Sequence, residues 1–242
     1  SSDVCSSDLA FVFANGPSLK KIDPHKLLNY KNKNNSDLIC VNNYLLSDMS
    51  CILPPDYMVI SDPTYFGHVP YLTKEDELLE KRSIDKINDL NVPVFIPIDF
   101  SSQNIFNKEY WINNNCYRSS SNVSNITSPM GYSAMTAYRA LSVALYMGYD
   151  EIYICGFDNS NFLSFQVNEE NILLQKDMHF YGTRADERIL PKSIVRNVAD
   201  FFLDYSIMFA DLYKFSKFNI INLDKNSFVD SFSKKHNIDI YK

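Results

Sequence analysis

Short apolar runs that stop abruptly at polar residues recur along the chain and predict buried strands. The first begins at Leu9 and reads LAFVFANGPS, so an apolar stretch leads directly into Asn-Gly-Pro-Ser. Runs of this length, bounded by Gly, Pro, Asn or Asp, are typical of strands in the interior of a sheet. Five more runs have this form and lie at 38–41, 57–61, 93–96, 151–155 and 219–223.

Helical spacing of apolar residues fills several of the intervals between these runs. Strands that alternate with helices predict an α/β fold with a mostly parallel sheet and helices on both faces, here a single Rossmann-like domain. We expect helices at 19–30, 73–90, 133–149 and 191–218, and a short one after Asn226-Ser227.

Three further segments lack such a period. Residues 101–129 are rich in Asn and Ser and predict a surface excursion with one edge strand. Residues 159–190 are polar and predict a lid segment over a binding site. Residues 1–8, SSDVCSSD, predict a disordered tail or a cloning scar, which leaves 9–242 as the domain.

Parallel strands would bring the polar residues that follow them to one edge of the sheet, where open α/β sheets bind ligands. Gly16 would allow a close backbone approach, Pro17 fixes φ, and Ser18 would cap the next segment while leaving amide hydrogens free for an anion. Taken singly, each position is equally explained by an ordinary turn. The candidates are Asn15, Gly16, Pro17, Ser18, Asn42, Asn43, Asp62, Gly156 and Asp158, with Asn222, Asn226 and Ser227 after the last strand.

Composition narrows the function classes. The 242 residues are 45% hydrophobic, which suffices for one sizeable core. A formal net charge of -6 argues against a nucleic-acid partner, because binding to phosphates needs a basic surface. Five cysteines without a CxxC pair favour a reducing, cytoplasmic location. There is no apolar run of about 18 residues, and no signal peptide is visible.

Several common motifs are absent from the sequence. It contains neither G-x-x-x-x-G-K-[ST] nor G-x-G-x-x-G, so a phosphate-loop NTPase and a standard dinucleotide fold are not supported. No G-x-S-x-G elbow points to Ser-His-Asp hydrolysis. The four histidines are scattered, so no zinc site is expected.

Five segments carry a family resemblance: FANGPSLKKID, CVNN, ALYMGYDEIYICGFD, HFYG and NLDKNSFVDSF, in this order. In these segments the chain resembles the bacterial sialyltransferases of glycosyltransferase family 42. It also resembles the related DUF115 family, which is similar to 6-hydroxymethylpterin diphosphokinase. The resemblance extends from Leu9 to the carboxyl end and rests mainly on the pair NGPSL and GYxEIYxxGxD.

The resemblance implies roles for individual residues. Asn15, Gly16 and Ser18 match the loop that holds the donor phosphate, and Asn42 matches an asparagine that holds the nucleotide. The start of the following helix contacts the donor in the sialyltransferases, and Ser133 and Thr136 fall near it. His179 matches the histidine that accepts the proton of the acceptor hydroxyl, a role that suits a neutral imidazole. Without the resemblance, His179 reads as an exposed loop residue.

Two departures from the sialyltransferases point away from CMP-sialic acid as the donor. The two tyrosines that follow their GxD strand are absent from NSNFLSF at 159–165, and Asp62 stands where they have Asn. The segment that ends in HFYG is closer to the DUF115 side. Tyr181 is a candidate to supply the missing hydroxyl.

The leading hypothesis is a cytoplasmic glycosyltransferase that moves a sugar from a nucleotide-activated donor to a glycan or glycolipid in surface polysaccharide synthesis, without a cofactor. One alternative is a diphosphotransferase that moves pyrophosphate from ATP to a hydroxymethylpterin-like acceptor, with Mg²⁺ held by Asp62 and Asp158. Another is a non-catalytic nucleotide- or glycan-binding protein. A homo-oligomer and peripheral association with the inner face of the membrane stay open.

Overall fold

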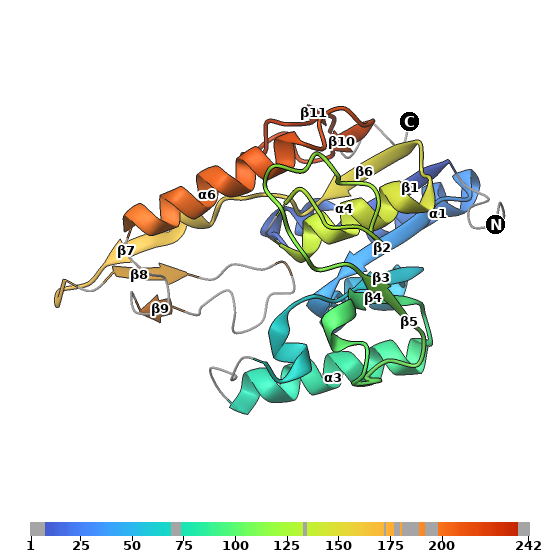
Figure 1. The fold of residues 1–242 in the computed structure, drawn as a ribbon, viewed down its shortest axis with the longest axis horizontal. Helices are drawn as coiled ribbons and strands as arrows, with labels where there is room; N and C mark the ends of the chain where they lie inside the picture. Colours follow the sequence, from blue (N-terminus) through green and yellow to red (C-terminus); the bar gives the residue numbers. More distant parts are fainter. Residues whose placement is uncertain are drawn as a thin grey trace.

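The structure is a computed structural model that describes residues 8–68, 74–132, 135–171, 173–176, 180, 189–191 and 198–236. An eight-stranded sheet forms its centre, and every strand pairing described in it is parallel (Figure 1). In spatial order the strands are β11 (Ser233–Lys234), β10 (Ile220–Asn222), β6 (Glu151–Cys155), β1 (Leu9–Phe13), β2 (Asp37–Val41), β3 (Tyr57–Val59), β4 (Val94–Pro97) and β5 (Glu109–Ile112). The predicted α/β class with a parallel sheet is confirmed.

The direction in which the sheet grows reverses beside β1. The chain first adds β2, β3, β4 and β5 on one side of β1. It then returns through helix α4 (Thr136–Met147) and places β6 on the other side, followed by β10 and β11. Phe13 at the end of β1 is level with Cys155 at the end of β6. The segments that leave these two ends therefore start side by side, at the kind of position where open α/β sheets bind ligands.

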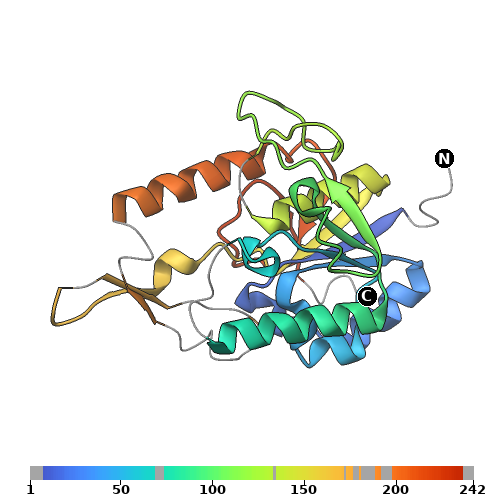
Figure 2. The same cartoon turned by 60° about the horizontal axis from the view of Figure 1, so that its bottom comes forward.

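Helices cover both faces of the sheet (Figure 2). Successive side chains of a strand point to opposite faces, so Val12 packs on the α4 side while Phe11 and Phe13 pack on the other side. The remaining helices are η1 (Pro17–Lys21), α1 (Pro24–Asn34), η2 (Asn42–Leu46), α2 (Met49–Ile52), η3 (Pro63–Phe66), α3 (Lys74–Leu90), η4 (Ile98–Phe100), η5 (Asn161–Ser164) and α6 (Val198–Tyr213), where η marks a 3₁₀ helix.

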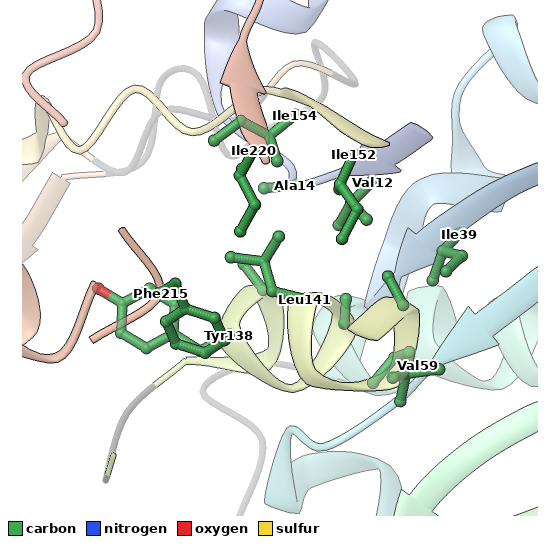
Figure 3. Packing of buried hydrophobic residues seen from close by; sticks show 14 of the residues in the cluster. Val12, Ala14, Ile39, Val59, Tyr138, Leu141, Ile152, Ile154, Phe215 and Ile220 are labelled. Carbon is green, nitrogen blue, oxygen red and sulfur yellow. The ribbon is translucent and has the colours of Figure 1, made fainter. Parts of the chain in front are cut away.

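Helix α4 lies close to the sheet because small residues form its inner face. Ala137, Ala140 and Ala144 recur at helical spacing and are buried in the same cluster as Ala10 and Ala14 of the first strand segment. Larger side chains fill the space around this contact. Figure 3 shows Leu141 of α4 below the strand residues and Tyr138 beside Phe215. The packing fixes the position of the amino end of α4 relative to the ends of the strands.

A second part of the molecule projects from the sheet (Figures 1 and 2). It contains the amino-terminal end of α6 and a three-stranded antiparallel sheet of β7 (Phe165–Val167), β8 (Leu173–Lys176) and β9 (Ile189–Pro191). We call this part the arm. Strands β7 and β8 lie within the predicted lid segment 159–190, and the sequence pattern did not predict them.

Three predicted helices differ from the structure. The helix expected over 191–218 is α6, at Val198–Tyr213, and Pro191 belongs to a strand instead. Residues 17–21 form a short 3₁₀ helix, and α1 begins only at Pro24, because Asp23 caps it by accepting from the backbone N–H groups of His25 and Lys26 at 3.1 Å each. The helix expected after Asn226 is wrong, since a turn and strand β11 follow there. None of the helices that the structure describes is long and apolar enough to cross a membrane.

Candidate functional site

The turn after β1 is bonded tightly to the turn after β6. The N–H of Gly16 donates to the carbonyl of Gly156 at 3.0 Å. The carboxylate of Asp158 accepts from the backbone N–H of Ser18 at 3.0 Å and from the Ser18 hydroxyl at 2.7 Å. We call these residues the first polar cluster at the sheet edge. Its three donors, the N–H groups of Gly16 and Ser18 and the hydroxyl of Ser18, all bind acceptors within the cluster.

Two glycines make this close approach feasible. A Cβ on Gly16 would overlap the carboxylate of Asp158 and the carbonyl of Gly156, and a Cβ on Gly156 would overlap the carbonyl of Ala14. Gly156 also has a φ of 73°, which other residues adopt at a cost. The predicted close approach at Gly16 therefore exists, but it is made to the protein itself. The Ser18 amide that was expected to face an anion donates to Asp158.

Burial raises the pKa of Asp158 above its ordinary value of 3.8, and the hydrogen bonds from Ser18 act in the opposite direction. A neighbouring carboxylate, Asp224, raises this pKa further. Burial is the largest of these causes. The hydrogen bonds from Ser18 therefore only partly offset the free energy that it costs to bury the ionised carboxylate of Asp158. This carboxylate has the character of a structural cap.

A hollow of about 440 Å³ opens beside the first cluster. Ser18 and Gly156 form part of its wall, together with Lys21, Asp224 and Lys225. The ammonium of Lys21 lies 3.1 Å from the carboxylate of Asp224, so these two opposite charges neutralise each other inside the hollow.

A second polar cluster lies at the same edge, between the ends of β2 and β3 and the start of α4. Asn42 Nδ2 donates to the hydroxyl of Thr136 at 3.2 Å, and this hydroxyl is 2.7 Å from that of Ser61. Arg139, one turn further along α4, donates to Asn114 Oδ1 at 2.6 Å and to Ser61 Oγ at 3.4 Å. Side chains from four separate segments therefore meet here.

These groups border a second hollow of about 360 Å³, within the range of about 300–1,000 Å³ that is usual for small-molecule sites. No carboxylate of the described residues forms an ion pair with Arg139, although Asp62 lines the same hollow. The lining comprises Ser61, Asp62, Pro63, Pro97, Phe100, Asn114, Met135, Thr136 and Arg139. An uncompensated guanidinium in a hollow is suited to bind an anion.

The start of α4 adds to this property. Met135, at its capping position, makes no capping hydrogen bond through its side chain, and the first backbone N–H groups of a helix have no partner within the helix itself. The backbone of Met135 has φ 47° and ψ 131°. Among the described residues, the other six non-glycine residues with positive φ are all Asn, which adopts this conformation most readily. An apolar residue held in a strained conformation at a hollow is typical of a functional site.

Two amide oxygens near the second cluster have no hydrogen-bond partner. Asn15 donates through Nδ2 to the carbonyl of Val41 at 3.2 Å, but its Oδ1 is buried without a donor. The Oδ1 of Asn42 is buried without a donor in the same way, and Asn42 has a φ of 42°. Leaving a buried acceptor without a donor costs about 1–3 kcal/mol, so ligand hydroxyl or N–H groups would find ready acceptors here.

The structure brings some of the predicted site residues together and separates others. Asn42 and Thr136 belong to the second cluster, and Asp62 lines its hollow while accepting from Thr64 N at 3.1 Å. Asn43 instead accepts from the hydroxyl of Tyr65 at 2.5 Å, away from both hollows. Pro17 is the first residue of η1.

Three predicted residues lie outside the described residues, namely Ser133, His179 and Tyr181. Phe180, between the last two in sequence, is described. Its N–H donates to the carbonyl of Asn15 at 3.0 Å, and its ring stacks on Tyr44.

The sequence pattern missed three residues of the second cluster: Ser61, Asn114 and Arg139. Ser61 is the last residue of the apolar run 57–61, and Asn114 lies in a segment without a period. For Arg139 a signal existed, because it is the only charged residue in the apolar run SAMTAYRALSVALYMGY and follows Thr136 by one helical turn.

No group of three or more potential metal ligands is found among the residues that the structure describes. The two carboxylates considered for Mg²⁺ are in different clusters, and each accepts hydrogen bonds at the start of a 3₁₀ helix, Asp62 at η3 and Asp158 at η1. As arranged, they do not form one coordination site.

Comparison with known proteins yields no relative. No protein-family model matches the chain, and no curated protein or solved structure matches it significantly. The resemblance to family 42 sialyltransferases and to the DUF115 family therefore stays a prediction. The fold and the second cluster define the chain as an α/β protein with a candidate anion-binding hollow at the carboxyl edge of its sheet.

Proposed function

We propose that the protein is a transferase that binds a nucleotide-activated sugar in the hollow beside Arg139 and passes the sugar to a hydroxyl group of a glycan or glycolipid. One observation carries the proposal: among the described residues, a guanidinium without a carboxylate partner and a helix start without a side-chain cap border the same hollow, and two buried amide oxygens beside it have no donor. The reversal of strand order between β1 and β6 supports a Rossmann-like classification, in which this edge is the usual ligand site.

The chemical groups of the second cluster fit such a donor. Its phosphate would accept hydrogen bonds from Arg139, from the hydroxyls of Ser61 and Thr136 and from the first N–H groups of α4. Its ribose or sugar hydroxyls would donate to Asn42 and Asn15. A ligand of this class carries a negative charge for Arg139 and hydrogen-bond donors for the amide oxygens of Asn42 and Asn15.

In the transfer step, the oxygen of the acceptor hydroxyl attacks the anomeric carbon of the sugar. The bond from that carbon to the phosphate oxygen breaks, and the nucleotide leaves with the electron pair. Arg139 would stabilise the negative charge that develops on this phosphate. The hydroxyl proton would pass to His179, a role that rests on the family resemblance. The contact of Phe180 with Asn15 supports a lid that reaches this edge.

Calorimetric titration tests the proposal. Wild type, Arg139→Met and Lys225→Met are each titrated with CMP, UDP, GDP and ATP, with and without Mg²⁺. We expect one of the first three nucleotides to bind without metal. Arg139→Met should bind it at least about tenfold more weakly, because a charged hydrogen bond contributes about 1.5–3 kcal/mol. Lys225→Met removes a cation from the other hollow and should bind normally.

Three results would contradict the proposal. Binding of none of the nucleotides would remove its basis. Loss of binding in Lys225→Met but not in Arg139→Met would move the site to the first hollow. Binding of ATP only with Mg²⁺ would favour the diphosphotransferase. If binding is found, His179→Ala should keep it and lose transfer, and a wild type that binds without any transfer would indicate the non-catalytic alternative.

A further inference from the structure

Helix α6 has a second apolar side that the described fold does not cover. One side packs within the arm, where Phe201 lies against Phe165 with ring centroids 4.5 Å apart and Tyr205 is buried. A different side faces solvent. It consists of exposed residues that recur at helical spacing, and we call it the α6 stripe: Ala199, Phe202, Leu203, Ser206, Ala210 and Tyr213.

The α6 stripe contains no charged residue along the whole helix. Leu203 is 60% exposed and Tyr213 is 69% exposed. The charged residues of α6 are Asp200, Asp204 and Asp211, which lie on another side because they are four and seven residues apart. A surface helix usually has an apolar side about 100° wide and charges around the rest. In α6 the apolar residues cover a wider part of the circumference. The part that does not pack within the arm is the exposed α6 stripe.

We infer that the α6 stripe is a dimer interface, on which a second copy of this chain packs its own α6 in antiparallel orientation about a two-fold axis at Ser206. Such an axis pairs each position with a partner so that the two numbers add up to 412. Phe202 then faces Ala210, Tyr213 faces Ala199, and Ser206 faces itself. The two aromatic side chains of the stripe each meet an alanine, which lets the two helices approach closely there, whereas Leu203 faces Phe209 at the margin of the contact.

A parallel arrangement lacks this complementarity. It would place Phe202 against Phe202 and Tyr213 against Tyr213, and would leave gaps between the alanines. Both orientations can be isologous, but only the antiparallel one sets Phe202 and Tyr213 against alanines.

The charges at the two ends of α6 support the same orientation. The amino-terminal half carries Asp200 and Asp204, and Lys217 follows the carboxyl end. Lys214 lies there too but is occupied within its own chain, since its ammonium is 3.6 Å from Asp211 and donates to the carbonyl of Arg118. Antiparallel packing brings the acidic half of one copy near the basic end of the other and also aligns the helix dipoles favourably. Acidic residues on the polar side argue against an anionic lipid surface as the occupant, since membrane-bound helices carry Lys and Arg there.

The apolar surface of the arm extends beyond α6. The helix has 16 residues and is about 24 Å long, and a stable dimer buries roughly 600 Å² or more per partner. Two further residues of the arm, Leu163 and Val167, are 64% and 63% exposed and extend the apolar surface. They adjoin Phe162 and Phe165, whose rings contact α6.

Sedimentation velocity of the whole chain tests this inference, which does not depend on the proposed function. Wild type should sediment at twice the chain mass of 28.0 kDa. Leu203→Arg and Ala210→Arg should be monomeric and have the circular dichroism of wild type, since both positions are exposed. The control is Leu78→Arg, an exposed apolar residue of α3 replaced in the same way, which should stay dimeric.

Chemical cross-linking locates the axis. In a chain whose Cys5 and Cys51 are replaced by Ser, Ser206→Cys should give a covalent dimer with a short bis-maleimide. Asp204→Cys, two residues away on another side of the helix, should not. Equal cross-linking of both variants would overturn the two-fold axis at Ser206.

Other results would overturn the dimer itself. A monomeric wild type would do so, and if it also co-sedimented with phosphatidylglycerol vesicles, the α6 stripe would be a lipid-binding surface instead. A wild type that is dimeric but unaffected by Leu203→Arg and Ala210→Arg would have its interface elsewhere.

Discussion

The two polar clusters at the carboxyl edge of the sheet have similar residues but opposite hydrogen-bonding states. In the first cluster, Asp158, Ser18 and the backbone of Gly16 and Gly156 satisfy one another. In the second, Arg139 has no carboxylate partner among the described residues, and the Oδ1 atom of Asn42 has no donor. The first cluster therefore holds the two halves of the sheet edge together, while the second has groups left over for a ligand.

The contrast shows that the sequence motif and the ligand site need not coincide. The Asn-Gly-Pro-Ser turn has the more noticeable sequence, yet its amide and hydroxyl groups are used internally. Buried polar groups without partners are rare in folded proteins, so their position is a better guide to a site than the motif is. We call the first cluster closed and the second cluster open. Substitutions in the closed cluster should lower the stability of the protein, whereas substitutions in the open cluster should weaken ligand binding.

The largest effect is expected from Gly156→Ala, which should lower the free energy of unfolding by about 3 kcal/mol or more. The new Cβ overlaps the carbonyl of Ala14, and the fold holds the alanine at a positive φ. Gly148→Ala is the matched control, because Gly148 has a φ of 90° with open space around it, and it should lose only about 1–2 kcal/mol for the positive φ. Urea denaturation measures both. Equal losses would show that the approach of the two turns is not tight.

Next in size is Asp158→Ala, which should lower the free energy of unfolding by about 2 kcal/mol because the buried N–H of Ser18 loses its acceptor. Arg139→Met in the open cluster should cost less than about 1 kcal/mol, since it removes hydrogen bonds from a partly exposed site. Chemical denaturation of the two variants side by side provides the comparison. A larger loss in Arg139→Met would mean that the second cluster is structural.

The pH dependence of stability should show a smaller effect. The native pKa of Asp158 is raised above its ordinary value of 3.8, so the charged form is disfavoured in the folded state. The stability of wild type relative to Asp158→Asn should be greatest below about pH 3.8 and should fall as pH rises through the native pKa. Thermal unfolding of both proteins between pH 3.5 and pH 7 measures this difference. An increase with pH would mean that the hydrogen bonds from Ser18 outweigh burial.

The smallest change in stability is expected for Asn42→Gly, within about 0.5 kcal/mol of wild type. Glycine adopts the positive φ freely, and the substitution removes a buried acceptor that has no donor, which offsets the lost bond to Thr136. Binding of the nucleotide should weaken at the same time. Asn35→Gly, at another positive φ outside the cluster, should leave binding unchanged. Unchanged binding in Asn42→Gly would remove this residue from the site.

Much of the sheet could be predicted because its strands are apolar runs with polar ends. All six of these runs contain a strand of the structure, and the edge strand expected in 101–129 is β5. The strands of the arm were harder to predict. The segment Phe165-Gln166-Val167 is too short to show alternation, and Phe165 packs against Phe201 of the distant helix α6. The prediction of a short helix after Asn226 was wrong because Asn-Ser can begin either a helix or a turn.

The site was predicted only in part, for a different physical reason. Asn42 and Thr136 stand next to strand and helix ends, where a local pattern can point to them. Ser61, Asn114 and Arg139 join them only because the packing of α4 on the sheet brings distant segments together, and no local pattern contains that information. In the same way, the sequence indicates that the backbone at Gly16 is approached closely. It does not show that Gly156 and Asp158 are the residues that approach it.

The central position of β1 has a consequence for how the chain folds during synthesis. β1 leaves the ribosome long before one of its two neighbours, β6, which is formed by residues 151–155. Until that segment emerges, one edge of the apolar segment LAFVFA stays without its partner strand. Contacts so distant in sequence form slowly, and an unpaired apolar edge readily joins other chains. Aggregation of nascent or truncated chains that end before Glu151 should therefore begin at β1.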